Sequence, residues 1–146
     1  MSHTYSKIWL HFIWSTHERV SLIAPNWKSE LINHFKENSQ KKAIYIDTAN
    51  GVSDHFHLLI NLSTTQSPAL VANLLKGESS NWINSNDFCQ NKFAWQEGFS
   101  VFSVSHSHLS RVRKYIWNQE QHHRKMTYLE EIEKFLIAYE IGRETP

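Results

Sequence analysis

The sequence predicts an α+β domain of the ferredoxin-like, split β-α-β class, in which helices pack on a central antiparallel sheet. The main observation is the order of hydrophobic patterns, which is strand, helix, strand, strand, helix, strand and then further helices. A second observation is the length of 146 residues, of which 40% are hydrophobic and 20% charged, as in one globular domain. Because no repeat or Pro/Gly-rich linker divides the chain, we expect a single domain over residues 1–146.

The first half of the chain predicts two strands separated by a helix, followed by a third strand. Residues 5–15 are rich in aromatic and branched side chains, which favour strands. Pro25 opens a segment with apolar residues four apart, which predicts a helix. Residues 43–48 alternate in polarity and predict a second strand, and the Asn-Gly pair at 50–51 predicts the turn after it. Residues 55–61 then return as a third strand, antiparallel to the second.

The next segment predicts a helix and a fourth strand. Ser67 and Pro68 are suited to the N-cap and to the first helical position. Gly77 lies inside this helix and weakens it by ~1 kcal/mol relative to alanine. Residues 93–104 are strand-like, with a bulge expected at Gly98.

Two helices are predicted at the C-terminal end, over about residues 107–122 and about 128–141. The first has an apolar stripe at helical spacing. The second opens with a capping box, in which Thr127 is the cap and Glu130 is the acidic residue three positions later.

The composition favours a cytoplasmic protein without a membrane partner. A single cysteine, Cys89, excludes an internal disulfide framework. No segment approaches the roughly eighteen apolar residues of a membrane helix. The apolar stretch near the N-terminus is interrupted by His11 and leads to no cleavage site, so a signal peptide is not expected.

The net charge of +1 does not indicate nucleic-acid binding, and the distribution of charge is more suggestive without deciding the question. Residues 111–125 are strongly basic, and a local basic face can hold phosphates on a nearly neutral protein. A solvated helix face is the alternative. The candidate phosphate-binding residues are Arg111, Lys114, Lys76, Arg124 and Lys125.

A His-Phe-His sequence within the third predicted strand is the first candidate site. Alternate strand residues share a face, so His55 and His57 point one way while Phe56 points into the core. Two such imidazoles make a convergent metal site if a third ligand comes from elsewhere. Chance alone gives ~0.7 such pairs in this composition, so buried or surface histidines without metal remain the alternative. A second pair, His106 and His108, lacks the apolar strand context and is interpreted as incidental.

The second candidate site lies on the basic helix. Tyr115 and Gln119 are four residues apart and therefore lie on one face. A phenol with a pKa near 10 is a poor nucleophile, but cations such as Arg111 and Lys114, together with a metal, favour the phenolate. The Gln119 amide oxygen is a hard ligand suited to Mg²⁺ or Mn²⁺. The alternative is an amphipathic helix whose tyrosine fills the edge of the core.

Together these residues resemble a known family, the single-tyrosine HUH transposases of the smallest bacterial insertion sequences and their REP-associated relatives. The resemblance rests on Asp54-His55-Phe56-His57-Leu58-Leu59 and on Lys114-Tyr115-Ile116 with Gln119 one helical turn later. Residues 9–16, 76–80 and 118–125 also look like segments of the family. The matches occur in the right order over nearly the whole chain.

The resemblance implies an HUH endonuclease fold and a DNA-cutting activity. It implies that His55, His57 and Gln119 bind Mg²⁺ or Mn²⁺, and that Tyr115 attacks single-stranded DNA to form a 5′-phosphotyrosine link. Religation to another 3′-OH completes strand transfer. The resemblance also implies a homodimer, in which the tyrosine helix of one subunit completes the other's site, and DNA hairpins at element ends as substrate.

Some features depart from this pattern or leave alternatives open. Extra imidazoles that could bind metal adventitiously are His106, His108, His122 and His123, and Tyr128 is a second tyrosine near the first. One alternative is a ferredoxin-like domain that binds single-stranded nucleic acid without cutting it. Another is a zinc hydrolase, which would not need the tyrosine at 115.

Overall fold

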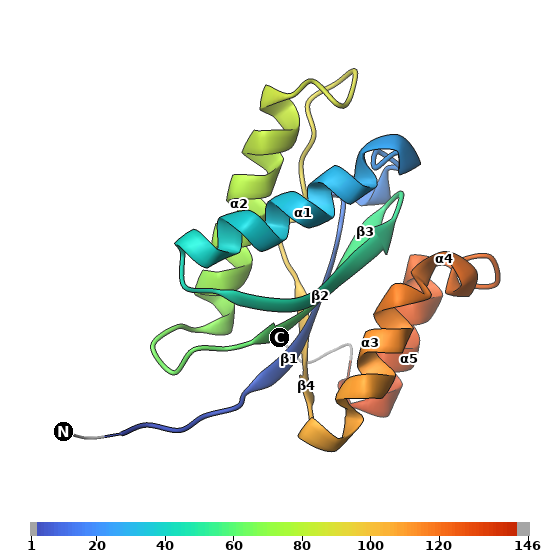
Figure 1. The fold of residues 1–146 in the computed structure, drawn as a ribbon. Coiled ribbons are helices and arrows are strands. Elements are labelled where there is room, and N and C mark those ends of the chain that lie inside the picture. The colour runs from blue at the N-terminus through green and yellow to red at the C-terminus, as the bar shows by residue number, and fades with distance from the viewer. Residues whose placement is uncertain (1–2, 143–146) are drawn as a thin grey trace.

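The structure, a computed structural model that describes residues 3–142, is built on a four-stranded antiparallel sheet (Figure 1). Its strands are β1 (Trp9–Ser15), β2 (Tyr45–Val52), β3 (His55–Asn61) and β4 (Ser100–Val104). Their order across the sheet is β2-β3-β1-β4, and each neighbouring pair is antiparallel. A split β-α-β chain produces this order, so the predicted ferredoxin-like α+β fold is confirmed.

Helices cover both faces of the sheet (Figure 1). On one face lie α1 (Pro25–Lys41) and α2 (Pro68–Ser85). On the other face lie α3 (Leu109–Trp117), α4 (Gln119–His122) and α5 (Tyr128–Ala138). Two short 3-10 turns, η1 (His17–Arg19) and η2 (His106–His108), precede α1 and α3.

The alternation along β3 places its side chains in two different environments. Phe56, Leu58 and Ile60 belong to the main core beneath α1 and α2, as predicted. Leu59 packs instead in a smaller core with residues of α3. His55 and His57 share the face of Leu59, so they lie between the sheet and α3–α5.

The turn predicted at residues 50–51 is wrong. β2 continues to Val52, and the turn residues are 53–54. Gly51 pairs with Phe56 of β3, and a Cβ at position 51 would lie 2.3 Å from the Phe56 ring. Glycine is therefore required because an aromatic ring crosses the backbone here, and not because the chain reverses.

Replacing Gly51 by alanine should destabilise the protein by about 1–3 kcal/mol, because the new methyl group overlaps the Phe56 ring and the His55 carbonyl oxygen. Gly77→Ala is the matched control. It lies within α2, nothing is within 4 Å of the added methyl group, and alanine is the better helix former. Urea unfolding followed by circular dichroism should give opposite signs for the two variants. A Gly51→Ala protein as stable as the original chain would contradict the close approach.

The helix expected over about residues 107–122 is divided in the structure. The turn η2, α3 and α4 follow one another, and Asn118 separates the two α-helices with φ −93° and ψ 23°. Asparagine favours helix ends because its side chain competes for backbone hydrogen bonds. The strand expected over residues 93–104 is shortened to β4, and the last helix ends at Ala138 rather than near 141.

Both predicted N-caps are confirmed. The Ser67 hydroxyl accepts the backbone N–H of Leu70, and Thr127 forms the capping box with Glu130. Helix α2 continues through Gly77 without a break. Within residues 3–142, none of the helices has the length and apolar character needed to cross a membrane.

Candidate active site

Two histidines of β3 form the centre of the candidate site. His55 pairs with Ser15 of β1, His57 pairs with Ile13, and neither histidine is exposed. Their ring centroids lie 5.2 Å apart, on the face of the sheet that α3–α5 cover. The predicted common orientation of the two imidazoles is confirmed.

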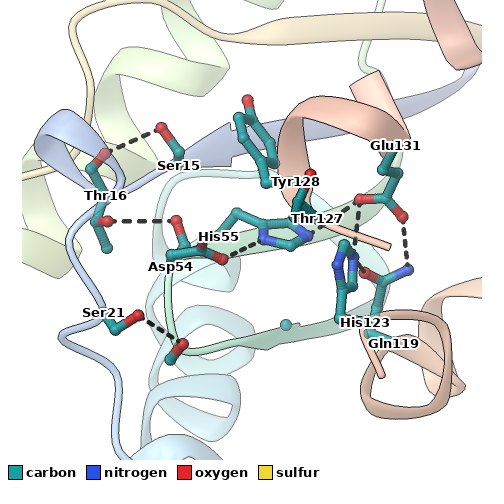
Figure 2. A network of polar contacts seen from close by, with 12 residues as sticks. Ser15, Thr16, Ser21, Asp54, His55, Gln119, His123, Thr127, Tyr128 and Glu131 are labelled. Carbon is teal, nitrogen blue, oxygen red and sulfur yellow. Dashed lines mark hydrogen bonds and ion pairs between the residues drawn. The ribbon is translucent and has the colours of Figure 1, made fainter. Parts of the chain in front are cut away.

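A carboxylate that was not predicted lies against these rings. Glu131 belongs to α5 and is 1% exposed. Its Oε1 atom lies 3.1 Å from His55 Nε2 and 3.0 Å from His57 Nε2. The same oxygen lies 3.1 Å from Nε2 of His123, and Figure 2 shows the contacts of this carboxylate with the His55 and His123 rings. Ligand atoms of the four residues lie within 4.8 Å of one another, and imidazole nitrogens with a carboxylate are a donor set that fits a divalent metal.

The Nδ1 atoms of both β3 histidines also have hydrogen-bond partners. Nδ1 of His55 is 2.7 Å from Oδ1 of Asp54, and Nδ1 of His57 is 2.8 Å from Nε2 of His11 on β1. Such bonds fix the orientation of an imidazole and are usual for histidines that bind metal. The arrangement around the β3 pair is therefore already oriented for ligation.

Tyr115 and Gln119 reach the same carboxylate from α3 and α4. The Tyr115 hydroxyl donates a hydrogen bond to Oε2 of Glu131, and Nε2 of Gln119 lies 3.3 Å from that oxygen. Oε1 of Gln119 is 3.1 Å from Nε2 of His123 (Figure 2). The four residues predicted as nucleophile and metal ligands thus meet within one chain.

Burial and hydrogen bonding shift the pKa values of this group in opposite directions. Burial acts to raise the pKa of the Glu131 carboxyl, but hydrogen bonds from the three neighbouring imidazoles outweigh it and hold the pKa well below its usual range. Burial lowers the pKa of His57 to about 4. Burial and the bond to the Glu131 carboxylate raise the pKa of the Tyr115 phenol. Without metal, the group therefore rests with an ionised Glu131, a neutral His57 and a protonated Tyr115.

Four of the five predicted phosphate-binding residues lie on the side of the sheet that carries this site. Arg111 and Tyr115 line a cavity of about 610 Å³ together with residues of β4 and α5. Arg124 and Lys125 lie between α4 and α5 and line a second cavity of about 500 Å³. Lys114 is exposed on α3. DNA contact by these side chains stays a prediction.

Lys76 has different surroundings. It lies on α2, beyond the opposite face of the sheet, and is 8% exposed. Its Nζ donates hydrogen bonds to the carbonyl oxygens of Glu97 and Gly98 at 3.0 and 2.9 Å. This ammonium therefore holds the loop before β4.

Sequence interpretation missed three members of the cluster, which are His11, His123 and Glu131. His11 carried a signal, because it alternates with Ile13 on a strand next to β3. His123 stood among several extra imidazoles, of which His106 is exposed in η2. Glu131 lies three residues after the first residue of α5, and only the docking of that helix brings its side chain into the site.

The second tyrosine, Tyr128, also lies close to the site. Its ring centroid is 4.7 Å from that of His55, and its hydroxyl is 3.2 Å from Oε1 of Gln96. Burial raises the pKa of this phenol to about 12. Tyr128 therefore packs against a candidate metal ligand, whereas Tyr115 meets the central carboxylate.

A comparison with protein families establishes what kind of chain this is. The family model described as "Transposase IS200 like" matches residues 4–119. The chain belongs to this family. The matched residues of this IS200-like transposase include the β3 histidines, Tyr115 and Gln119, whereas His123 and Glu131 lie beyond them. Among curated proteins, none matches the chain.

Two solved structures share the fold of this IS200-like transposase. One is a candidate transposase from Deinococcus radiodurans R1, with a TM-score of 0.65 and 19% identity, covering 82% of this chain and 95% of that one. The other is a REP-associated tyrosine transposase bound to a REP hairpin, with a TM-score of 0.62 and 13% identity. That match covers 84% of this chain and 73% of the other. At these identities the likeness establishes the common fold.

Proposed function

We propose that this transposase cuts and rejoins single-stranded DNA through a 5′-phosphotyrosine bond at Tyr115. One observation carries the proposal: the Tyr115 hydroxyl and the Nε2 atoms of His55 and His57 all contact one buried carboxylate. A tyrosine needs neighbouring positive charge to attack at neutral pH, and a divalent ion held beside it supplies that charge. We assign Mg²⁺ or Mn²⁺ binding to His55, His57 and Gln119.

In the proposed reaction the Tyr115 oxygen attacks the phosphorus of the scissile phosphodiester in line. The bond from phosphorus to the 3′-oxygen breaks, so the 5′-phosphate stays on Tyr115 and a free 3′-OH is left. Before attack the phenol donates a hydrogen bond to Oε2 of Glu131. As the tyrosine oxygen attacks, its proton passes to this carboxylate and from there to the departing 3′-oxygen. A bound metal would polarise the scissile phosphate. Attack by a different 3′-OH reverses the step and rejoins the strands.

Basic residues near the tyrosine are assigned to DNA binding. Arg111 lines the cavity that reaches Tyr115, which supports a contact with the strand being cut. Lys114, Arg124 and Lys125 extend positive charge along the same side. The relative bound to a REP hairpin supports a DNA hairpin as the element that this chain recognises.

We also propose a homodimer, following the family resemblance. The placement of Tyr115 beside the histidines of its own chain supports cleavage in cis, in which each subunit uses its own tyrosine. In this arrangement the second subunit would hold the second DNA end and would not have to lend its tyrosine helix.

A covalent-adduct assay tests the proposal. Labelled single-stranded DNA from the ends of the element is incubated with the protein and Mn²⁺ or Mg²⁺, and the products are separated under denaturing conditions. We expect a protein–DNA band that forms with either metal and is lost in EDTA. DNA binding without any such band would leave a binding module as the function, and a band that persists in EDTA would remove the role of the metal.

A further inference from the structure

His123 is held in the way that a metal-binding histidine is held. Its Nδ1 lies 2.8 Å from the carbonyl oxygen of Met126, and because a carbonyl only accepts, Nδ1 carries a proton. Nε2 lies 3.1 Å from Oε1 of Glu131 and donates a hydrogen bond to it without metal; once that proton is lost, the lone pair of Nε2 is directed at the same place. Asp54 orients His55 in the same manner, with Nε2 turned to the same oxygen. Two imidazoles from distant segments thus direct their Nε2 atoms to one point.

The imidazole of His57 and the carboxylate of Glu131 lie at the same point as these two nitrogens. Nε2 of His57 is 3.0 Å from Oε1 of Glu131, while its Nδ1 is engaged by His11. Glu131 is 1% exposed, so its charge is not solvated by water. Donor atoms about 2.1 Å from a tetrahedral metal ion lie about 3.4 Å from one another. Oε1 of Glu131 is 3.0–3.1 Å from each of the three nitrogens, and all four donor atoms lie within 4.8 Å of one another. A cation among these donors would satisfy the nitrogens and the carboxylate together.

We infer that His123 and Glu131 are metal ligands, and that they extend the site of His55 and His57 to three imidazoles and one carboxylate. This inference rests on the metal centre of the proposed function and enlarges its ligand set. Both added residues follow residue 119, where the match to the transposase family ends. Oε1 of Gln119, 3.1 Å from Nε2 of His123, borders the same donors.

The donor set has a consequence for the choice of metal and for the fold. Imidazole nitrogens suit transition metals such as Zn²⁺, Fe²⁺ and Ni²⁺, whereas Mg²⁺ prefers oxygen. Of the two ions assigned to the reaction, we expect Mn²⁺, a transition metal, to bind this donor set more tightly than Mg²⁺. Because Glu131 belongs to α5, metal binding also fastens this last helix to β3. A segment outside the family match therefore becomes part of the metal centre.

The ligands are counted by X-ray absorption spectroscopy of the Co²⁺- or Zn²⁺-loaded chain, together with a Mn²⁺ titration followed by electron paramagnetic resonance. We expect three imidazoles in the original chain and two in His123→Asn. Removing a residue that only hydrogen-bonds to a metal ligand typically weakens metal affinity by roughly 10–100-fold. Because His123→Asn and Glu131→Gln each remove a ligand itself, each should weaken Mn²⁺ binding by about 100-fold or more. The exposed controls His106→Asn and Glu37→Gln should bind Mn²⁺ as the original chain does.

Two imidazoles in the original chain, or unchanged Mn²⁺ affinity in a folded His123→Asn variant, would overturn the inference. Circular dichroism in EDTA establishes whether each variant is folded. If Glu131→Gln does not fold, the X-ray absorption spectrum of the original chain tests the carboxylate, because a fit without a protein oxygen ligand would overturn the role of Glu131. Three imidazoles without any covalent DNA adduct would keep the inference and remove the proposed function. An adduct formed with two imidazoles would do the reverse.

Discussion

Tyr115→Phe should abolish the covalent protein–DNA adduct while the protein still binds Mn²⁺ and DNA. The substitution removes one oxygen atom, and that oxygen is the proposed nucleophile. It also removes the hydrogen bond to Oε2 of Glu131, whose contribution to stability is about 1.5–3 kcal/mol for a bond to a charged group. The adduct is measured on denaturing gels, and binding of the hairpin is measured separately by fluorescence anisotropy.

Tyr128→Phe is the matched control for this experiment. Its hydroxyl faces Gln96 rather than the central carboxylate, so the adduct should form as in the original chain. An adduct that survives Tyr115→Phe but is lost in Tyr128→Phe would transfer the nucleophile to the second tyrosine. Loss in both variants, with metal binding retained, would show that the reaction also needs the Tyr128 hydroxyl and its contact with Gln96.

Two residue pairs were predicted correctly to share a face. Both predictions rest on local backbone geometry. His55 and His57 are two apart on a strand, and Tyr115 and Gln119 are four apart across the end of one helix and the start of the next. Asn118 interrupts the helix between them without turning the second side chain away. Periodicity over a few residues is therefore enough to orient each pair.

Glu131 shows why the rest of the site could not be predicted. On α5 it lies among apolar neighbours such as Tyr128, Ile132 and Phe135, where a carboxylate is costly to bury without partners. Its partners come from other segments, including β3 and the loop after α4, and the sequence gives no measure of how those segments dock. Only the packed structure shows three imidazoles and a phenol gathered around this charge.

Gly51 illustrates the opposite case, in which a strong local signal was misleading. An Asn-Gly pair favours tight hairpin turns, but at this position Phe56 on the neighbouring strand needs a residue without a side chain. The cross-strand requirement comes from residue pairing five positions later. Local turn preference and tertiary packing therefore select the same amino acid for different reasons.

His57→Asn should reduce the rate of adduct formation by about 1,000-fold, because a metal that polarises the scissile phosphate contributes several kcal/mol to transition-state stabilisation. His57 is the imidazole nearest to Oε1 of Glu131, and it also links His11 to the site. Initial rates of adduct formation are measured over a range of Mn²⁺ concentrations. If the loss arises from weaker metal binding, high Mn²⁺ should restore part of the rate.

The control His106→Asn tests whether the His-x-His spacing alone is enough for activity or whether the buried strand is also needed. His106 belongs to the other His-x-His pair of the chain, and its spacing is identical to that of the β3 pair. It lies exposed in η2, outside the strands of the sheet. An unchanged rate in this variant would locate the chemistry in the buried strand. A loss equal to that of His57→Asn would mean that the metal needed for cleavage binds elsewhere, since only a ligand at the reacting phosphate has such an effect.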